Sequence, residues 1–269
     1  MDISNFSDKR TYIMGILNVT PDSFSDGGRY NSVQAALKHA EDMVSEGVDI
    51  IDVGGESTRP GYTPVDSEEE IARVVPVIKE LRKYFNIPIS IDTYKSAVAE
   101  RALDAGADIV NDVWGFRIDP MMAPITARYN AMCVLNHNSD DTYYGDLVRD
   151  VARELGESVK TALEAGVRKD RIIIDPGVGF GKTYEQNMEI IRHLPEFANM
   201  GYPVLAGISR KSVLCKTLGI KPIEADAATA AVSVMCVQAG CRFIRVHNVK
   251  MNLDAVRMTE ALLYGTGKE

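Results

Sequence analysis

The chain has 269 residues, a length that fits one large domain or two medium ones and exceeds that of a small disulfide-stapled fold. Hydrophobic residues make up 45% and charged residues 25%, so intrinsic disorder and fibrous structure are excluded. The 38 acidic residues outnumber the 30 Lys and Arg residues, and the net charge of -8 argues against general binding to nucleic acid.

The cysteines and the N-terminal residues indicate a reducing compartment. None of the four cysteines forms a CxxC pair, and no histidine lies at zinc-finger spacing from them, so they are expected to be free thiols. Residues 1–8 carry acids and lack an apolar core, so no signal peptide is visible. Residues 225–240, the most apolar long stretch, are too few and too polar to span a bilayer. We therefore expect a soluble protein of the cytoplasm that has no membrane partner.

Short β-branched runs alternate with longer amphipathic segments along the whole chain. The runs predict buried parallel strands over residues 12–19, 49–53, 88–92, 109–111, 132–136, 171–175, 203–208 and 243–247. Helical periodicity follows over residues 33–44, 71–81, 98–105, 148–163, 187–194 and 255–262, with a weaker, shorter helix over residues 119–129. Eight strand runs that alternate with helical segments predict a single (β/α)8 TIM barrel over residues 1–269. The alternative is an open doubly wound sheet, which usually shows a dinucleotide-binding fingerprint.

The predicted strands end in an unusual number of polar residues. These include Asn18, Asp52, Asp92, Asn111, Asp112, Asn136, His137, Asp175, Arg245 and His247, and Lys211 follows the seventh strand. In a barrel, all these strand ends lie at one face, where such enzymes build their sites. Acids and amides beside two or three cations suit a flat polar heterocycle together with an anion, because Lys donates to a ring carbonyl and Arg to phosphate oxygens.

Each of these groups also has a purely structural explanation. Asp92 would cap the next helix, and Asp175 would form a turn with Pro176. Arg59 would pair with the acidic residues 66–70, which are expected to form a solvated first helical turn. Eight unrelated caps on one rim explain the pattern less well than a single site does.

The glycine-rich run over residues 177–183 resembles a phosphate-binding P-loop without being one. Pro176 stands where a Walker motif needs its first glycine, and Lys182 breaks the GxGxxG pattern. Ser209 lacks the GxSxG surroundings of a hydrolase nucleophile. The glycines 27–28 and the turn at 59–61 predict loops that close over the site.

Two long motifs carry a resemblance to a known family. Residues 14–28, MGILNVTPDSFSDGG, resemble the first signature of the dihydropteroate synthases, and residues 51–61, IDVGGESTRPG, resemble the second. Shorter blocks at residues 90–93, 109–113, 174–177, 209–211 and 245–247 follow in the family's order. This resemblance implies a (β/α)8 barrel that joins 6-hydroxymethyl-7,8-dihydropterin pyrophosphate to p-aminobenzoate. The products are 7,8-dihydropteroate and pyrophosphate, in folate biosynthesis.

The resemblance also assigns roles to individual residues. It implies that the pterin is bound by Asp92, Asn111, Asp175 and Lys211, with Asp175 at the amino edge of the ring and Lys211 at the carbonyl. It implies that pyrophosphate is held by Asn18, Arg245 and His247, and that Asn18 ligates Mg2+. The two loops that close over the site contribute Asp22, Phe24, Thr58, Arg59 and Pro60. Ser212 lines the p-aminobenzoate pocket, where sulfonamides compete.

The implied chemistry needs no protein nucleophile. The metal and the cations neutralise the charge that develops on pyrophosphate, and the pterin ring stabilises a carbocation at its exocyclic carbon, so the path is SN1-like. Asp22, Arg59 and Lys211 are the expected catalytic residues, with Asp22 stabilising that cation. Closed loops would exclude competing water.

The chain departs from the family pattern at a few positions. Asn136 stands where the family often has Met, Ser139 follows where an Arg is common, and Asn248 replaces the usual Asp. An apolar contact to the pterin face is expected to weaken at Asn136.

Two alternatives stay open at this stage. One is a methyltransferase that moves a methyl group from methyltetrahydrofolate to a corrinoid protein on a similar barrel. The other is a non-catalytic pterin-binding paralogue. The resemblance further implies a homodimer that pairs through the last helices, and the small and apolar residues 225–240 suit such a contact.

Overall fold

Short parallel strands form the wall around which the rest of the chain is arranged. The structure is a computed structural model, and it describes residues 10–19, 29–56 and 64–265. These residues form eight parallel strands: β1 (Tyr12–Asn18), β2 (Ile50–Gly54), β3 (Ile89–Asp92), β4 (Ile109–Asp112), β5 (Met132–Asn136), β6 (Ile172–Asp175), β7 (Leu205–Ala206) and β8 (Phe243–Val246). Their order is β6-β5-β4-β3-β2-β1-β8-β7, and a parallel bridge between Ile174 and Val204 closes the ring. The predicted TIM barrel is confirmed.

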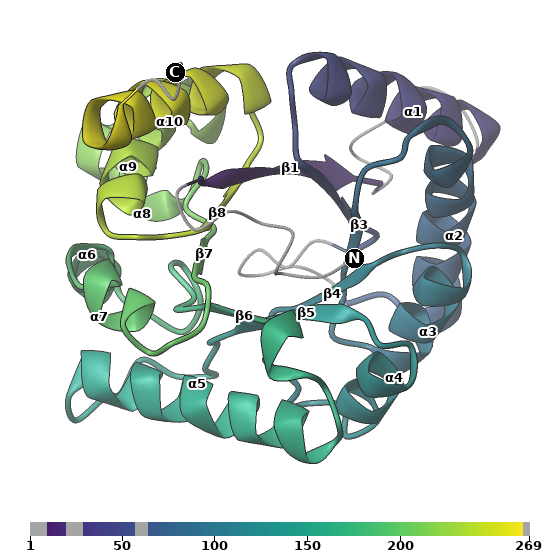
Figure 1. The fold of residues 1–269 in the computed structure, drawn as a ribbon, viewed down its shortest axis with the longest axis horizontal. Helices are drawn as coiled ribbons and strands as arrows, with labels where there is room; N and C mark the ends of the chain where they lie inside the picture. Colours follow the sequence, from purple (N-terminus) through teal and green to yellow (C-terminus); the bar gives the residue numbers. More distant parts are fainter. Residues whose placement is uncertain (1–9, 20–28, 57–63, 266–269) are drawn as a thin grey trace.

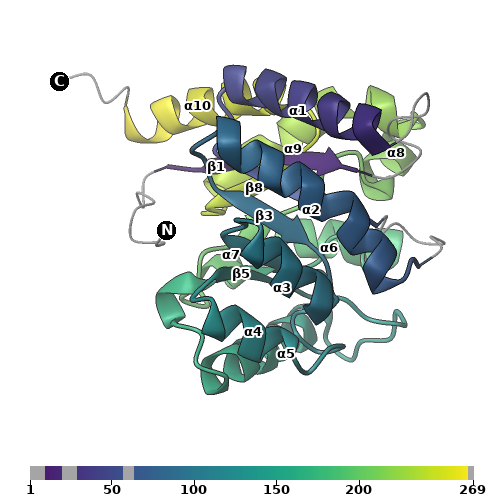
Figure 2. The ribbon, with the colours of Figure 1, turned by 90° about the vertical axis from the view of Figure 1, so that its right-hand side faces the viewer.

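Helices surround this barrel, as Figure 1 shows. They are α1 (Arg29–Ser45), α2 (Ser67–Tyr84), α3 (Ser96–Asp104), α4 (Met122–Arg128), α5 (Leu147–Glu164), α6 (Tyr184–Arg192), α7 (Leu194–Ala198), α8 (Ser212–Leu218), α9 (Asp226–Gln238) and α10 (Val249–Tyr264), with 3-10 turns at Lys169–Arg171 and Pro222–Glu224. Figure 2 shows α1, α2, α3 and α4 following one another along one side. Within the described residues, none of these helices has the length and apolar character needed to cross a membrane.

Two predicted elements differ from the observed ones. The strand expected over residues 203–208 is reduced to Leu205–Ala206. The helix expected over residues 187–194 ends at Arg192, and α7 starts after a break at His193. Pro195 lies in the first turn of α7, where a missing N–H costs nothing, whereas continuing α6 through it would remove a helical hydrogen bond.

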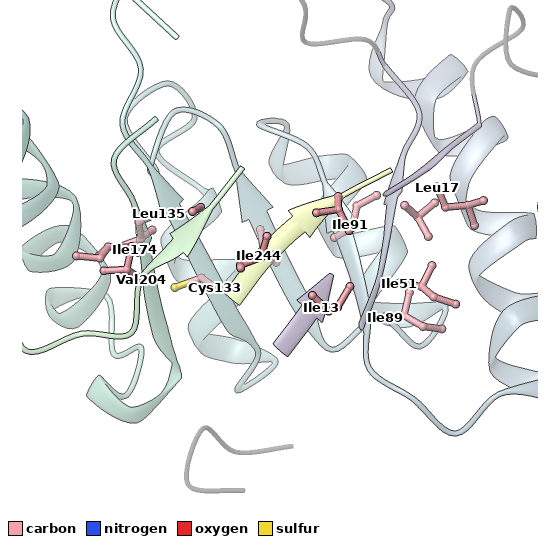
Figure 3. Close-up of a cluster of buried hydrophobic side chains, with 14 of the residues drawn as sticks. Ile13, Leu17, Ile51, Ile89, Ile91, Cys133, Leu135, Ile174, Val204 and Ile244 are labelled. Carbon is pink, nitrogen blue, oxygen red and sulfur yellow. The ribbon is translucent and has the colours of Figure 1, made fainter. Parts of the chain in front are cut away.

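Side chains alternate between two apolar layers along each strand. Outward-facing residues such as Ile13, Ile91 and Ile174 pack against the helices, and Figure 3 shows this cluster. Inward-facing residues form a second cluster inside the barrel: Tyr12, Met14, Ile50, Ile109, Met132, Val134, Ile173, Leu205 and Phe243. Side chains alternate with a period of two. The inward-facing position that follows this apolar cluster therefore lies at the carboxyl end of the strand.

The acidic run at residues 66–70 is only partly the solvated first turn that the sequence predicted. Asp66 does cap α2, accepting a 2.7 Å hydrogen bond from the N–H of Glu69. Glu70, however, is 1% exposed and accepts a 2.7 Å hydrogen bond from Lys95 Nζ. Lys95 also donates to Glu56, 2.6 Å away, so the prediction was wrong for Glu70.

Candidate active site

The inward-facing positions at the strand ends carry most of the predicted site residues. Asp92 lies two residues after Ser90 on β3, Asn111 two after Ile109, and Asp175 two after Ile173. The strand register aligns Asn18 with Gly54, Gly54 with Asp92, and Asp92 with Asn111 across neighbouring strands. The pleat and register together therefore bring these side chains to one mouth of the barrel.

A cavity opens between these strand ends. It has a volume of about 300 Å³, counting its open side. Its lining residues are Asp92, Asn111, Val113, Asn136, Asp175, Phe180, Gly207, Lys211 and Arg245. All four residues predicted to bind the pterin and one of those predicted for pyrophosphate thus line one cavity.

Arg245 connects two carboxylates on neighbouring strands. Its Nε donates to Asp52 Oδ2 at 2.6 Å, and its Nη2 pairs with Asp92. Asn111 Nδ2 lies 3.3 Å from Asp52 Oδ2. Burial lowers the pKa of Arg245, but the charges of Asp52 and then Asp92 outweigh burial and raise it overall. The guanidinium is therefore a fixed positive charge in this wall.

Asp92 keeps one acceptor free for a ligand. Its Oδ1 is buried and has no hydrogen-bond partner among the described residues, and the same holds for Asn136 Oδ1. Burial raises the pKa of Asp92 to about 7, against the opposing charge of Arg245. The helix after β3 is not capped by Asp92, because the N-cap residue of α3 is Lys95 and makes no side-chain cap bond. Buried acceptors without partners are costly, so both oxygens indicate a ligand with N–H donors.

Asp175 and Lys211 also line this cavity. Asp175 Oδ1 accepts a 2.7 Å hydrogen bond from the N–H of Gly177, while burial raises the pKa of Asp175 against the charge of Lys211. Lys211 as a whole is half-buried, with its ammonium inside the cavity, where it donates to the carbonyl of Val178 and lies 4.1 Å from the ring centre of Phe180. Burial lowers the pKa of Lys211 to about 8.

The predicted pyrophosphate residues lie at and around this mouth. His247 Nδ1 is 2.9 Å from Ser209 Oγ. Asn248 caps α10 by accepting from the N–H of Met251 at 3.1 Å, and its Nδ2 donates to Asp226 at 3.1 Å. The departure at Asn248 is therefore a working helix cap. Ser212 is exposed at the start of α8 and is not among the lining residues of the cavity.

Several predicted residues lie outside the described part of the chain. These are Asp22 and Phe24 of the first loop and Thr58, Arg59 and Pro60 of the second. Conversely, Asp52 was expected among the polar strand ends but was given no role in the site, and Phe180 was not predicted at all. For Asp52, the available signal was its inward position two residues before Gly54 on β2. For Phe180, no strand period applies, because it lies in the loop after β6.

Oxygen atoms near the end of β1 suit a hard cation. Within the described residues, no group of three or more His, Cys, Asp or Glu side chains could hold a metal ion. Asn18 Oδ1 and Asp92 Oδ2 both lie close to Gly54, 3.6 Å and 3.8 Å from where its Cβ would be, and Asp92 Oδ2 already accepts from Arg245. Mg2+ binds through one or two protein oxygens and completes its shell with water and phosphate, so the donors present fit it.

The fold and this mouth are typical of barrel enzymes, and the donors and acceptors at the mouth suit a flat ring rich in N–H donors beside an anion. The model of the family described as pterin binding enzyme matches residues 14–247. The chain is 51% identical over 258 residues to a dihydropteroate synthase of Clostridium beijerinckii, and this alignment covers 95% of each of the two chains.

Solved structures agree with this match. A dihydropteroate synthase from Clostridium difficile, solved in the presence of pteroic acid, has a TM-score of 0.93 and 52% identity over 96% of this chain and 98% of that chain. A Xanthomonas albilineans dihydropteroate synthase with 4-aminobenzoic acid has a TM-score of 0.92 and 42% identity over 96% and 94%. The chain therefore belongs to the pterin binding enzymes and, among them, to the dihydropteroate synthases, which are transferases.

Proposed function

We propose that the cavity residues divide the dihydropteroate synthase reaction between recognition of the pterin ring and stabilisation of the leaving group. The observation that carries this division is the pair of unpartnered acceptors, Asp92 Oδ1 and Asn136 Oδ1, beside Asp175. The 2-amino group and the ring N–H groups of a dihydropterin supply donors for these oxygens, and Lys211 donates to the ring carbonyl. One relative was solved in the presence of pteroic acid and another with 4-aminobenzoic acid, which supports a pterin and p-aminobenzoate as the two substrates.

The pyrophosphate group is assigned to Arg245, His247 and Asn18. Asp52 and Asp92 take Nε and Nη2 of Arg245, which leaves Nη1 for a phosphate oxygen. Mg2+, if bound, supplies positive charge that neutralises the leaving pyrophosphate, and Asn18 Oδ1 is its proposed protein ligand.

The reaction proceeds through charge separation. The bond between the exocyclic carbon of the pterin and the pyrophosphate oxygen breaks, and its electron pair leaves with pyrophosphate. The positive charge spreads into the pterin ring, where the buried carboxylates of Asp92 and Asp175 stabilise it. The amino nitrogen of p-aminobenzoate then bonds to that carbon and loses a proton to solvent. We propose that Asp22 and Arg59 act as catalytic residues, with Asp22 stabilising the cation. Phe24, Thr58 and Pro60 belong to the loops proposed to close over the site, and Ser212 to the p-aminobenzoate pocket, where sulfonamides would compete.

We also propose a homodimer formed through α9 and α10. Exposed apolar side chains gather on these two adjacent helices: Met235 is 46% exposed, Met258 60% and Leu262 74%. A single copy leaves this apolar surface to water, and an identical copy related by a two-fold axis would cover it. The free cysteines Cys133, Cys215, Cys236 and Cys241 support the cytoplasm as the location.

A pyrophosphate-release assay tests the proposed function. The purified chain is given Mg2+ and dihydropterin pyrophosphate, with and without p-aminobenzoate. We expect release that depends on p-aminobenzoate, formation of dihydropteroate, and inhibition by a sulfonamide that competes with p-aminobenzoate. Binding of dihydropterin pyrophosphate without release would indicate the non-catalytic paralogue. Neither binding nor release would direct the test to methyltetrahydrofolate.

A further inference from the structure

The loop between β6 and α6 contains a half-buried lysine, Lys182, that the reaction described above does not use. Lys182 Nζ donates to the carbonyl oxygens of Gly177 and Phe180, each at 3.0 Å, and lies 2.9 Å from His137 Nδ1. Burial lowers the pKa of Lys182 to about 7, and in its protonated form the ammonium group has three protons, which these three acceptors match one to one. Lys182 belongs to the glycine-rich run that resembles a P-loop, and here the run wraps around its own lysine.

The neighbouring histidine orients this lysine. His137 is 1% exposed, and burial followed by the charge of Lys182 lowers its pKa to about 2, so the ring is neutral. Its Nδ1 accepts from Lys182, which places the ring proton on Nε2, where Glu154 Oε2 lies 3.2 Å away. A chain of three side chains therefore runs from α5 through the end of β5 to the loop.

Two glycines of the loop leave no room for side chains. Gly177 has φ +72°, and a Cβ there would lie 1.7 Å from the carbonyl oxygen of His137. Gly179 has φ +89°, and a Cβ there would lie 2.8 Å from Cδ of Lys211. The loop backbone is thus held between the end of β5 and the ligand-facing lysine.

The same loop contributes to the cavity wall. The N–H of Gly177 donates to Asp175, the carbonyl of Val178 accepts from Lys211, and the ring of Phe180 lies beneath the Lys211 ammonium. Lys182 donates to the carbonyls of Gly177 and Phe180 in this same backbone. Its positive charge also favours the ionised form of Asp175, since it opposes the burial that raises the pKa of that carboxyl.

We propose that Lys182, oriented by His137, is a positioning residue for the pterin: it holds the β6–α6 loop in the shape that presents Asp175, Phe180 and Lys211 to the ring. This inference rests on the proposed function, because it takes the cavity to be the pterin site. Lys182 is not among the residues that line the cavity, so it acts on the pterin through the loop. Loss of its ammonium should weaken pterin binding without changing the site for p-aminobenzoate.

The test compares Lys182→Met with Lys160→Met, an exposed lysine on α5 whose side chain is 73% accessible. Calorimetry with dihydropterin pyrophosphate gives the Kd, and steady-state kinetics give KM for each substrate. We expect Lys182→Met to raise the Kd at least tenfold, to raise KM for the pterin substrate, and to leave KM for p-aminobenzoate within twofold. A residue that only stabilised the fold would lower the melting temperature and leave the Kd of the folded protein unchanged.

A second pair of variants covers the case in which Lys182→Met does not fold. His137→Gln keeps an acceptor for Lys182, whereas His137→Leu removes it. We expect a Kd near that of the unmodified chain for His137→Gln and one about fivefold higher for His137→Leu. Equal pterin affinity in this pair, or in Lys182→Met, overturns the proposal. Failure of the unmodified chain to bind the pterin would refute the site itself, and with it this role of Lys182.

Discussion

The two ends of the barrel interior are built by the same strands in opposite ways. On β6, Ile173 faces inward among apolar side chains, and two residues later Asp175 faces inward into the cavity. The same step separates Val134 from Asn136 on β5 and Phe243 from Arg245 on β8. The first inward residues contribute the free energy of burial, while the last present polar side chains to the cavity. Stability and function are therefore separated along one strand by a step of two residues.

The largest expected effect comes from the polar end of β6. Asp175→Asn removes a charge that accepts from ring N–H groups and stabilises the cationic ring, so kcat/KM should fall about 10³-fold, or about 4 kcal/mol. Burial raises the pKa of Asp175, so its ionised form is costly in the folded state and the variant should unfold at no lower temperature. Pyrophosphate release and thermal melting measure the two quantities. A large drop in melting temperature would show that this end also carries stability.

The apolar end of the same strand should behave in the reverse way. Ile173 is fully buried, so Ile173→Ala should lower the free energy of unfolding by about 3 kcal/mol through lost burial and a residual cavity. The Kd for dihydropterin pyrophosphate of the folded variant should stay within twofold of the original. Urea unfolding and calorimetry at a temperature well below the melting point check this. A weakened Kd would contradict the separation.

The pH dependence of the polar end follows from Asp92. The pKa of Asp92 is about 7 in the folded chain and lower in the unfolded chain. Between about pH 4 and pH 7 the folded chain therefore binds more protons than the unfolded chain does. The contribution of Asp92 to stability declines as pH rises across that window. Pterin binding needs the ionised carboxylate, so affinity should fall up to about tenfold per unit as pH drops below about 7. Calorimetry from pH 5.5 to 8.5 tests this, with Asp92→Asn as control. The control should bind weakly and without that slope.

The smallest expected effect concerns the departure at Asn136. Asn136→Leu replaces the unpaired acceptor by an apolar side chain of similar volume. Pterin affinity should therefore fall about tenfold, or about 1.4 kcal/mol. Stability should be unchanged or higher, because an unsatisfied buried oxygen is removed. Val134→Leu, two residues earlier on β5, is the matched control and should change stability but not Kd. Unchanged Kd in Asn136→Leu would mean that Asn136 Oδ1 faces no donor of the ligand.

Much of the fold was predictable because its signals are local. A strand has period two and a buried parallel strand is apolar throughout, so each of the eight strands was found within a few residues of its bounds. The inward parity of Asp92, Asn111 and Asp175 follows from the same period. The break at His193 and the short β7 were missed, because a proline in a helical first turn and the closure of the ring at Val204 depend on neighbouring elements.

The sequence by itself determined the barrel class, the family, and which polar residues end the strands, because these depend on periodicity and contiguous motifs. The tertiary structure decided which of these residues meet. Arg245 joins Asp52 across 193 residues of chain, Glu70 pairs with Lys95, and Lys182 reaches His137, the residue that follows β5. Such pairings depend on how the barrel closes. A charged side chain is structural when other residues of the fold already occupy its donors or acceptors, and it faces a ligand when some of them are left over.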